Sequence, residues 1–306
     1  MATTIRGAAW PELDLDAWED TRDTLHMWTQ VAGKVRLELA PKINHWWHVP
    51  LYVTARGLTT SPIPYRDRTF ELEFDFVEHV LHVLCSDGAA RRVALAPRTT
   101  ADFYAEVMAR LREVGVEVDI YTTPVEVPDP IPFEKDTVHA SYDAEYANRF
   151  WRALAQGERV MQEFRGRFLG KCSPVHFFWG SFDLAVTRFS GRAAPPHPGV
   201  PGVPDAITRE AYSHEVSSAG FWPGGGAARS AYFYSYAYPE PEGLAAARVG
   251  PAEAFWSGDF REFLLPYDAV RTVDDPDARL TEFLQTTYEA AADLLRWDRA
   301  ALECAW

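Results

Sequence analysis

The sequence predicts an α+β protein in which antiparallel sheets are flanked by helices. Segments that alternate apolar and polar residues, as half-buried strands do, occur in both halves of the chain. Ser86, Asp87 and Gly88 supply a turn between two strand-forming segments, which is typical of a β-hairpin. Segments with apolar residues three and four positions apart bracket these strands and indicate amphipathic helices.

Length and composition allow a ligand-binding globular protein and disfavour several other classes. The 306 residues suffice for two domains, or one large one, with a substantial core. The 11 Trp, 13 Tyr and 18 Phe make up 14% of the chain, and such residues both fill cores and line pockets for organic ligands. The formal net charge is −14 and Lys and Arg form no run, so we expect no nucleic-acid or membrane partner.

The chain shows no recognisable membrane or export segment. It has no apolar run of about 18 residues, and residues 1–10 lack a basic region followed by an apolar one. Cys85, Cys172 and Cys304 are odd in number and widely spaced, which favours reduced thiols over a disulfide framework. We therefore expect a cytoplasmic protein, and the oligomeric state stays open.

The N-terminal half, residues 1–123, is predicted to begin and end with a helix. Apolar spacing indicates a first helix over residues 14–32 that ends at Gly33. Thr99 with Asp102 resembles a capping box for the second helix. The other elements expected here are a strand over 35–39, a strand over 51–56, a loop over 61–64, strand-forming residues over 70–84 that turn into 92–96, a helix end at Gly115 and a strand over 116–121.

A connector separates this half from the C-terminal half, residues 141–306. Residues 124–136 hold four prolines and four acids, so we place the boundary between the halves at 124–140. The elements expected after it are a long helix from a Ser141 cap to Gly170, a strand carrying Asp183, loops over 192–204 and 221–226, a strand over 231–238, a strand ending near 263–268, and a helix with an Asp275 cap and Pro276 in its first turn.

Two stretches share a pattern that indicates an internal duplication. His45–Gly57 and Lys171–Arg188 each place a histidine before aromatic residues and an alternating strand. A shift of 131 positions (176 − 45 = 131) superimposes His45 on His176 and keeps the strand phase. If the match is more than chance, two pseudo-twofold-related halves could present both histidines to one cleft, a common place for small-molecule sites.

Five residues near these stretches are candidates for acid–base catalysis. A histidine oriented by a carboxylate is the basic unit of such catalysis. We expect His176 to be the general acid or base, with Asp183 or Glu215 orienting it and His45 or His214 assisting.

The direction of the candidate carboxylates depends on strand alternation. Asp183 alternates with Phe182 and Leu184, so it faces solvent or a cleft if those two fill the core. His214 and Glu215 diverge on a strand, so at most one of them reaches a given site.

Aromatic and cationic residues near the candidates suggest a pocket. Arg56 and Arg188 each follow an alternating strand and either hold a substrate carboxylate or form surface ion pairs. The expected pocket walls are Trp46, Trp47, Phe178, Trp179 and Trp222.

A metal site is the alternative chemistry for the same histidines. Two histidines and one carboxylate suffice for zinc or non-haem iron. The candidate ligands are His45, His48, His176 and His214. His79 and His82 are three apart in a predicted strand and point to opposite faces, so they form no ready-made clamp.

Other catalytic and cofactor signatures are weak. Gly180-Ser181 lacks the glycine pattern of a nucleophile elbow. The glycines of residues 220–226 match neither a dinucleotide-binding nor a Walker pattern, so we expect no nucleotide cofactor.

Three motifs resemble a known family. Residues 44–52, 173–188 and 210–215 are similar to motifs of an uncharacterised bacterial family classed as a domain of unknown function. The resemblance spans nearly the whole chain and implies no activity, cofactor or catalytic residue.

The leading hypothesis from the sequence is an enzyme that acts on a small organic molecule in an aromatic-lined cleft by histidine and carboxylate acid–base chemistry. An iron- or zinc-dependent enzyme and a non-catalytic ligand-binding protein are the alternatives. Substrate and reaction type stay open.

Overall fold

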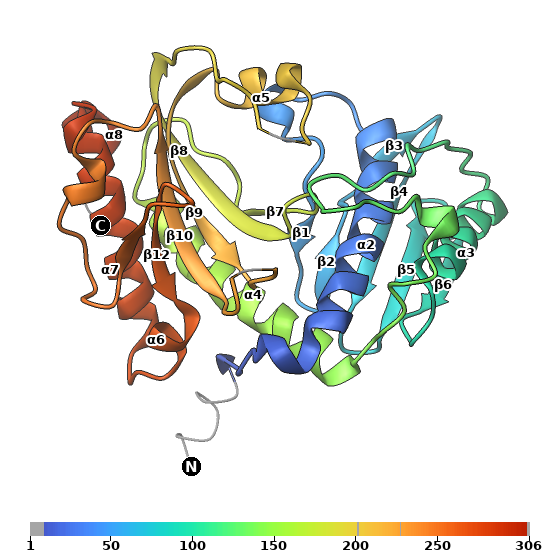
Figure 1. The fold of residues 1–306 in the computed structure, drawn as a ribbon. Coiled ribbons are helices and arrows are strands. Elements are labelled where there is room, and N and C mark those ends of the chain that lie inside the picture. Colours follow the sequence, from blue (N-terminus) through green and yellow to red (C-terminus); the bar gives the residue numbers. More distant parts are fainter. Residues whose placement is uncertain (1–8, 201, 227, 305–306) are drawn as a thin grey trace.

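The computed structural model describes residues 9–200, 202–226 and 228–304 and shows two antiparallel sheets with helices packed on them (Figure 1). The predicted α+β class is confirmed. The sheets stand side by side, each with six strands in the described part of the chain.

The N-terminal sheet is built from short strands and hairpins. Its strand order is β1-β2-β4-β5-β6, and β3 pairs with β4. The hairpin at Ser86–Gly88 is confirmed, because β5 and β6 pair across it. The strands are β1 (Tyr52–Val53), β2 (Gly57–Thr59), β3 (Ile63–Tyr65), β4 (Arg68–Asp75), β5 (Val80–Cys85) and β6 (Ala90–Ala94).

Helices α2 (Leu15–Leu39) and α3 (Thr100–Glu113) pack together against this sheet (Figure 1). Trp28 of α2 stacks on Phe103 of α3 with ring centroids 4.4 Å apart. The predicted cap is confirmed, since Thr99 Oγ1 accepts a hydrogen bond from the Asp102 amide at 3.1 Å.

The first helix does not end at Gly33, and the predicted strand over 35–39 is helical. Glycine lies here because the indole of Trp179 packs on the helix backbone, where a Cβ would come within 2.2 Å of the ring. Gly33 therefore lets the Trp179 indole approach the helix closely. In the sequence alone, a glycine needed for such a contact looks the same as a glycine that ends a helix.

The strand-forming residues over 70–84 lie in two strands, because a turn at Phe76–His79 separates β4 from β5. Two further predictions for this half were wrong. Residues 63–65 pair as β3 instead of forming a loop. Residues 116–121 carry no assigned strand. Local composition favours β structure in the first and last of these segments, but pairing partners decide which residues join a sheet.

The C-terminal sheet is a larger meander with the order β11-β12-β10-β9-β8-β7. The strand predicted over 231–238 is confirmed as β10, whereas Phe221 and Trp222, expected in a loop, end β9. The strands are β7 (His176–Phe178), β8 (Asp183–Ala193), β9 (His214–Trp222), β10 (Tyr232–Tyr238), β11 (Phe255–Ser257) and β12 (Glu262–Pro266).

Two long helices, α4 (Ala144–Gly166) and α7 (Pro276–Leu294), cover one face of this sheet (Figure 1). The cap of α7 is Asp275 with Pro276 in the first turn, as predicted. The cap of α4 is Asp143 instead of Ser141. The other helical segments that can be bounded in the described residues are α5 (Asp205–Ala211), α6 (Tyr267–Arg271), α8 (Arg299–Leu302) and the 3-10 turns η1 (Asn44–Trp46), η2 (Phe133–Lys135) and η3 (Leu244–Ala246).

The two sheets join where the two histidine-aromatic stretches meet. The amide of Leu51 donates to the carbonyl of Phe177 at 2.8 Å, and the amide of Phe177 donates back at 2.7 Å. Internal duplication is not confirmed, because His45 lies in the turn η1 whereas His176 lies in β7. The domain boundary at 124–140 stays a prediction.

None of the helices in the described ranges has an apolar stretch long enough to cross a bilayer.

Candidate functional site

A cavity of about 1170 Å³ lies on the face of the C-terminal sheet that α4 and α7 leave uncovered. Strand alternation assigns each residue of β8 to one face. Asp183, Ala185 and Thr187 line the cavity, whereas Leu184 and Val186 are fully buried in the core. The prediction that Asp183 faces away from Phe182 and Leu184 is therefore confirmed, and it faces the cavity.

The other walls come from both halves of the chain. Residues of α2, η1, the connector, the loop before α5, and strands β7, β9, β10 and β12 contribute. All five predicted wall residues are among them: Trp46, Trp47, Phe178, Trp179 and Trp222.

Asp183 is the most buried carboxylate of the cavity, with 8% of its surface exposed. The hydroxyl of Ser181 donates to its Oδ1 and the phenol of Tyr234 donates to its Oδ2. Burial raises the pKa of Asp183, and the two hydrogen bonds oppose this rise. Burial also raises the pKa of Tyr234, so this phenol stays protonated and keeps donating.

Glu262 and Glu126 add two carboxyl groups that no motif in the sequence indicated. Burial, and then the charge of Asp183, raises the pKa of Glu262 to about 8 and that of Glu126 to about 7. Neither side chain has a hydrogen-bond or ion-pair partner within the described ranges, and both line the cavity. The Glu126 residue is exposed to solvent at the cavity mouth, whereas Glu262 is half-buried, so Glu262 is the better shielded of the two.

The features that could have identified Glu262 and Glu126 as site residues differ. Glu262 is the first residue of β12. Phe263 and Leu265, the first and third residues after it, are buried, so strand alternation places Glu262 on the opposite face. Glu126 lies in the connector with a φ of 57°, a left-handed conformation that is rare outside glycine. Only the folded connector brings it to the cavity.

Hydroxyl groups extend the polar part of the cavity. The phenols of Tyr212 and Tyr236 share a hydrogen bond of 2.8 Å, and the hydroxyls of Thr187 and Ser218 share one of 2.9 Å. Burial raises the pKa of both tyrosines, so both remain neutral donors and acceptors at physiological pH.

Two glycines make room for the polar groups. A Cβ on Gly180 would lie 2.3 Å from Oε1 of Glu126, and one on Gly220 would lie 2.3 Å from the phenol oxygen of Tyr234. Both positions therefore exclude any larger side chain unless a site residue moves.

His176 lines the cavity but forms no dyad with a carboxylate. In the register of β7 and β8, His176 lies opposite Ala185, and Phe178 lies opposite Asp183. Only 1% of His176 is exposed, and its Nδ1 has no partner in the part of the chain described. Burial, with Arg36 and Arg165 nearby, lowers the pKa of His176 to about 3. The ring is therefore neutral at physiological pH, which disfavours the expected proton exchange.

Of the other predicted histidines, His45 lines the cavity and His48 and His214 are outside its lining. Nδ1 of His45 contacts the carbonyl of Ala211 at 3.1 Å. His214 lies against His45 with ring centroids 5.8 Å apart. His48 accepts a hydrogen bond from the amide of Ile43 at 3.3 Å. The predicted metal ligands are thus held by separate contacts and do not converge on one point.

Three other predicted site residues lie outside the cavity lining. Glu215 accepts hydrogen bonds from Arg192 at 2.6 Å and from Trp297 at 3.0 Å. Arg188 is buried on the helix-covered face, where its guanidinium lies 3.4 Å from the ring centroid of Phe164. Arg56 pairs with Asp75 in the N-terminal sheet. Of the two roles considered for the arginines, holding a substrate carboxylate or forming an ion pair, Arg56 has the second.

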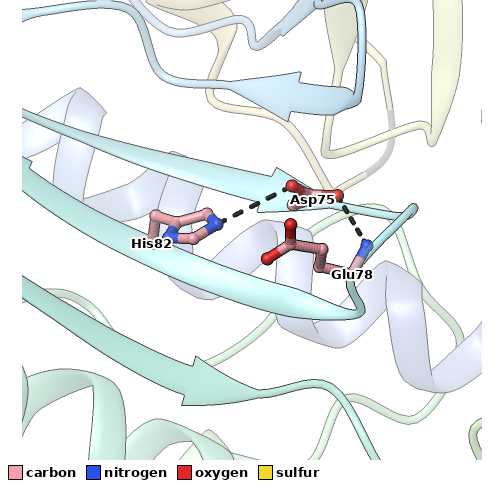
Figure 2. Close-up of side chains that lie close together, drawn as sticks. All are labelled: Asp75, Glu78 and His82. Carbon is pink, nitrogen blue, oxygen red and sulfur yellow. Dashed lines mark hydrogen bonds and ion pairs between the residues drawn. The ribbon is translucent and has the colours of Figure 1, made fainter.

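Asp75, Glu78 and His82 form a separate polar cluster at the hairpin of β4 and β5 (Figure 2). Nε2 of His82 lies 3.8 Å from the Asp75 carboxylate, which also accepts hydrogen bonds from the amides of Val77 and Glu78 at 2.8 Å each. Their ligand atoms lie within 4.8 Å of one another, and no other group of three His, Cys, Asp or Glu in the described residues does so.

A cation of the protein already occupies this cluster. Arg56 pairs with Asp75 and with Glu78, the latter at 3.2 Å. Burial alone would raise the pKa of Asp75, but Arg56 and the two amides outweigh it and lower the pKa. Arg56 balances one of the two carboxylate charges, and the Asp75 contacts with the Val77 and Glu78 amides stabilise the turn.

Comparison with known proteins yields one match. A family model described as a family of unknown function, DUF5996, matches residues 10–304. No curated protein and no solved structure matches the chain.

Proposed function

The chain belongs to DUF5996, a family of unknown function, and we propose that it is an enzyme that moves protons on a small organic molecule bound in the aromatic cavity. The observation that carries this proposal is the pair of unpartnered carboxyl groups, Glu126 and Glu262, beside the Asp183–Tyr234 hydrogen bond. Carboxyl groups with a pKa near the working pH are suited to general acid–base catalysis.

The proposed roles follow from the contacts of each group. The carboxylate of Glu262 accepts a proton from a carbon or nitrogen of the bound molecule, and the electron pair of the broken bond stays on that molecule. Its shielded position makes it the main base, and Glu126 is the second exchangeable carboxyl. Asp183 and Tyr234 form a fixed polar pair that positions the reacting group. His176 was expected to be the base. In this proposal it is a neutral, buried group that forms hydrogen bonds.

A general probe of base strength tests the proposal without knowledge of the natural substrate. 5-Nitrobenzisoxazole loses its C3 proton to a base, its N–O bond breaks, and coloured 2-cyano-4-nitrophenolate forms. We expect the protein to accelerate this reaction, with a rate that rises with pH through the range about 7 to 8, because only the carboxylate form is a base.

Substitutions assign the rate to the cavity. Glu262→Gln should lower the rate about 100-fold, which is the usual scale of general base catalysis. Glu78→Gln, a change to a carboxyl of the other cluster, should leave it within about twofold. Equal rates for wild type and Glu262→Gln would contradict the proposal. Tight ligand binding without any turnover would instead favour a non-catalytic binding protein.

A further inference from the structure

The charge balance of the cavity indicates what kind of molecule it accepts. Four carboxyl groups line it: the exposed Glu38 of α2 and three that lie around the sheet face, Asp183, Glu126 and Glu262. Across the described residues, no Lys, Arg or His nitrogen lies within the 4.0 Å of an ion pair of any of the three. Carboxylates in a protected site normally have a cationic or hydrogen-bonding partner. Asp183 has two hydroxyl donors, whereas Glu126 and Glu262 have no partner among the described residues, so a cationic group of a ligand would pair with these two when they ionise.

The lysine that lines the cavity does not balance these carboxylates. The amine of Lys34 donates to the carbonyl of Thr123 at 2.7 Å and lies 4.8 Å from the ring centroid of Tyr121. Burial lowers the pKa of Lys34 to about 8, which weakens it further as a fixed cation.

A second observation points to a ligand independently of the acids. His176 is 99% buried and lines the cavity, yet its Nδ1 has no partner among the residues that the structure describes. An unsatisfied buried nitrogen costs free energy, so a ligand group that hydrogen-bonds to it stabilises the complex.

The walls are suited to the body of an organic cation. Tyr234 and Tyr236 lie parallel with ring centroids 6.2 Å apart, and Trp222 and Phe260 meet edge to face at 6.3 Å. All four line the cavity. Aromatic faces attract ammonium groups and bury apolar carbon at the same time.

We infer that the cavity binds an amine with an aromatic or apolar body, whose ammonium group lies among Asp183, Glu126 and Glu262 and whose body lies against the aromatic walls. The inference names the substrate class of the proposed enzyme and so rests on the same cavity.

Binding of such a cation is expected to release protons. An ammonium ion stabilises the charged form of the carboxyls, so affinity should rise between pH 6 and pH 8 as Glu126 and Glu262 ionise. The other titratable groups facing the carboxyls keep their charge state over most of this range: Tyr212, Tyr234, Tyr236 and His176 stay neutral, and Lys34 is charged below a pKa of about 8.

Three indoles that differ in charge test the inference. Tryptamine is cationic, tryptophol is neutral and indole-3-acetate is anionic, while the ring is the same. In calorimetry at pH 7.5 we expect tryptamine to bind at least about tenfold more tightly than either of the others. Glu262→Gln should reduce that preference about tenfold or more, and Glu78→Gln should leave it unchanged. Circular dichroism of each variant confirms that it is folded.

The outcomes separate this inference from the proposed function. Equal or tighter binding of tryptophol or indole-3-acetate, or no heat with tryptamine at millimolar concentration, overturns the inference even if benzisoxazole turnover persists. Selective binding of tryptamine without benzisoxazole turnover supports the inference and overturns the proposed enzyme. Selective binding together with competitive inhibition of the turnover supports both.

Discussion

The two carboxylate clusters of this protein occupy similar places in their sheets but have opposite electrostatics. Asp75 is joined by Arg56 and by two backbone amides, and its pKa is lowered. Asp183 is joined by two hydroxyl groups and faces two more acids, and its pKa is raised. Both aspartates are at least 92% buried. The difference shows that the partner, and not burial alone, decides whether a carboxylate serves structure or remains available to a ligand.

The largest effect on stability is expected when Asp75, the carboxylate paired with Arg56, is removed. Asp75→Ala removes the Arg56 contact and both amide contacts at 2.8 Å. We expect the free energy of unfolding to fall by about 3 kcal/mol, since several hydrogen bonds to a charged group are lost at once. Urea denaturation at pH 6 measures the change. Glu262→Gln under the same conditions should change it by less than about 1 kcal/mol, and a similar loss in both variants would remove the contrast between the clusters.

Removal of an unpaired carboxylate is expected to stabilise the protein in alkaline solution. The pKa of Glu262 rises from 4.5 in the unfolded chain to about 8 in the fold, so the folded state holds the extra proton between these values. The contribution of Glu262 to stability therefore falls as pH rises from about 4.5 to 8 and levels off above that range. At pH 9 we expect Glu262→Gln to be more stable than wild type by about 2 kcal/mol, less than the full shift implies because cavity water screens the charge.

The control for this prediction is its pH dependence. The gap between Glu262→Gln and wild type should nearly vanish at pH 5 in thermal denaturation. A gap of constant size at both pH values would mean that packing, and not charge, separates the two proteins.

A lysine introduced into the cavity should pair with the cavity carboxylates, as Arg56 pairs with Asp75. Ala185 lies on the cavity face of β8, two residues from Asp183. Ala185→Lys is expected to weaken tryptamine binding at least tenfold, about 1.4 kcal/mol, because its ammonium competes for the same carboxylates. Ala185→Met has a long side chain without a charge and serves as the matched control in calorimetry. Equal losses in both variants would assign the effect to steric filling.

The smallest expected effect concerns the paired cluster in acid. The pKa of Asp75 is lowered from 3.8, so its contribution to stability is present above about pH 4 and is lost as the pH falls through the folded-state value. Asp75→Asn should be less stable than wild type at pH 7 by about 1 kcal/mol, and the gap should narrow between pH 4 and pH 2. Urea titrations across this range check the trend, which a widening gap in acid would refute.

The site was partly predictable because some of its signals are local. Alternation along β8 placed Asp183 on the face opposite Leu184, and the same rule applies to Glu262. The aromatic wall residues other than Trp222 were identified from their proximity to His45 and His176. Catalytic pairing was not predictable in this way, because the register of β7 and β8 sets Phe178, and not His176, opposite Asp183.

The sequence by itself determined the fold class, the caps at Thr99 and Asp275 and the face on which Asp183 lies, because hydrogen-bonding caps and strand alternation depend on neighbours in the chain. Only the tertiary structure decided that helix α2 continues through Gly33, since the indole that needs this glycine comes from residue 179. It also decided that Glu126, Asp183 and Glu262 share one cavity while Arg56 pairs with Asp75 in the other sheet. Charge balance at a site depends on residues that are distant in sequence, and their positions follow from packing and strand register.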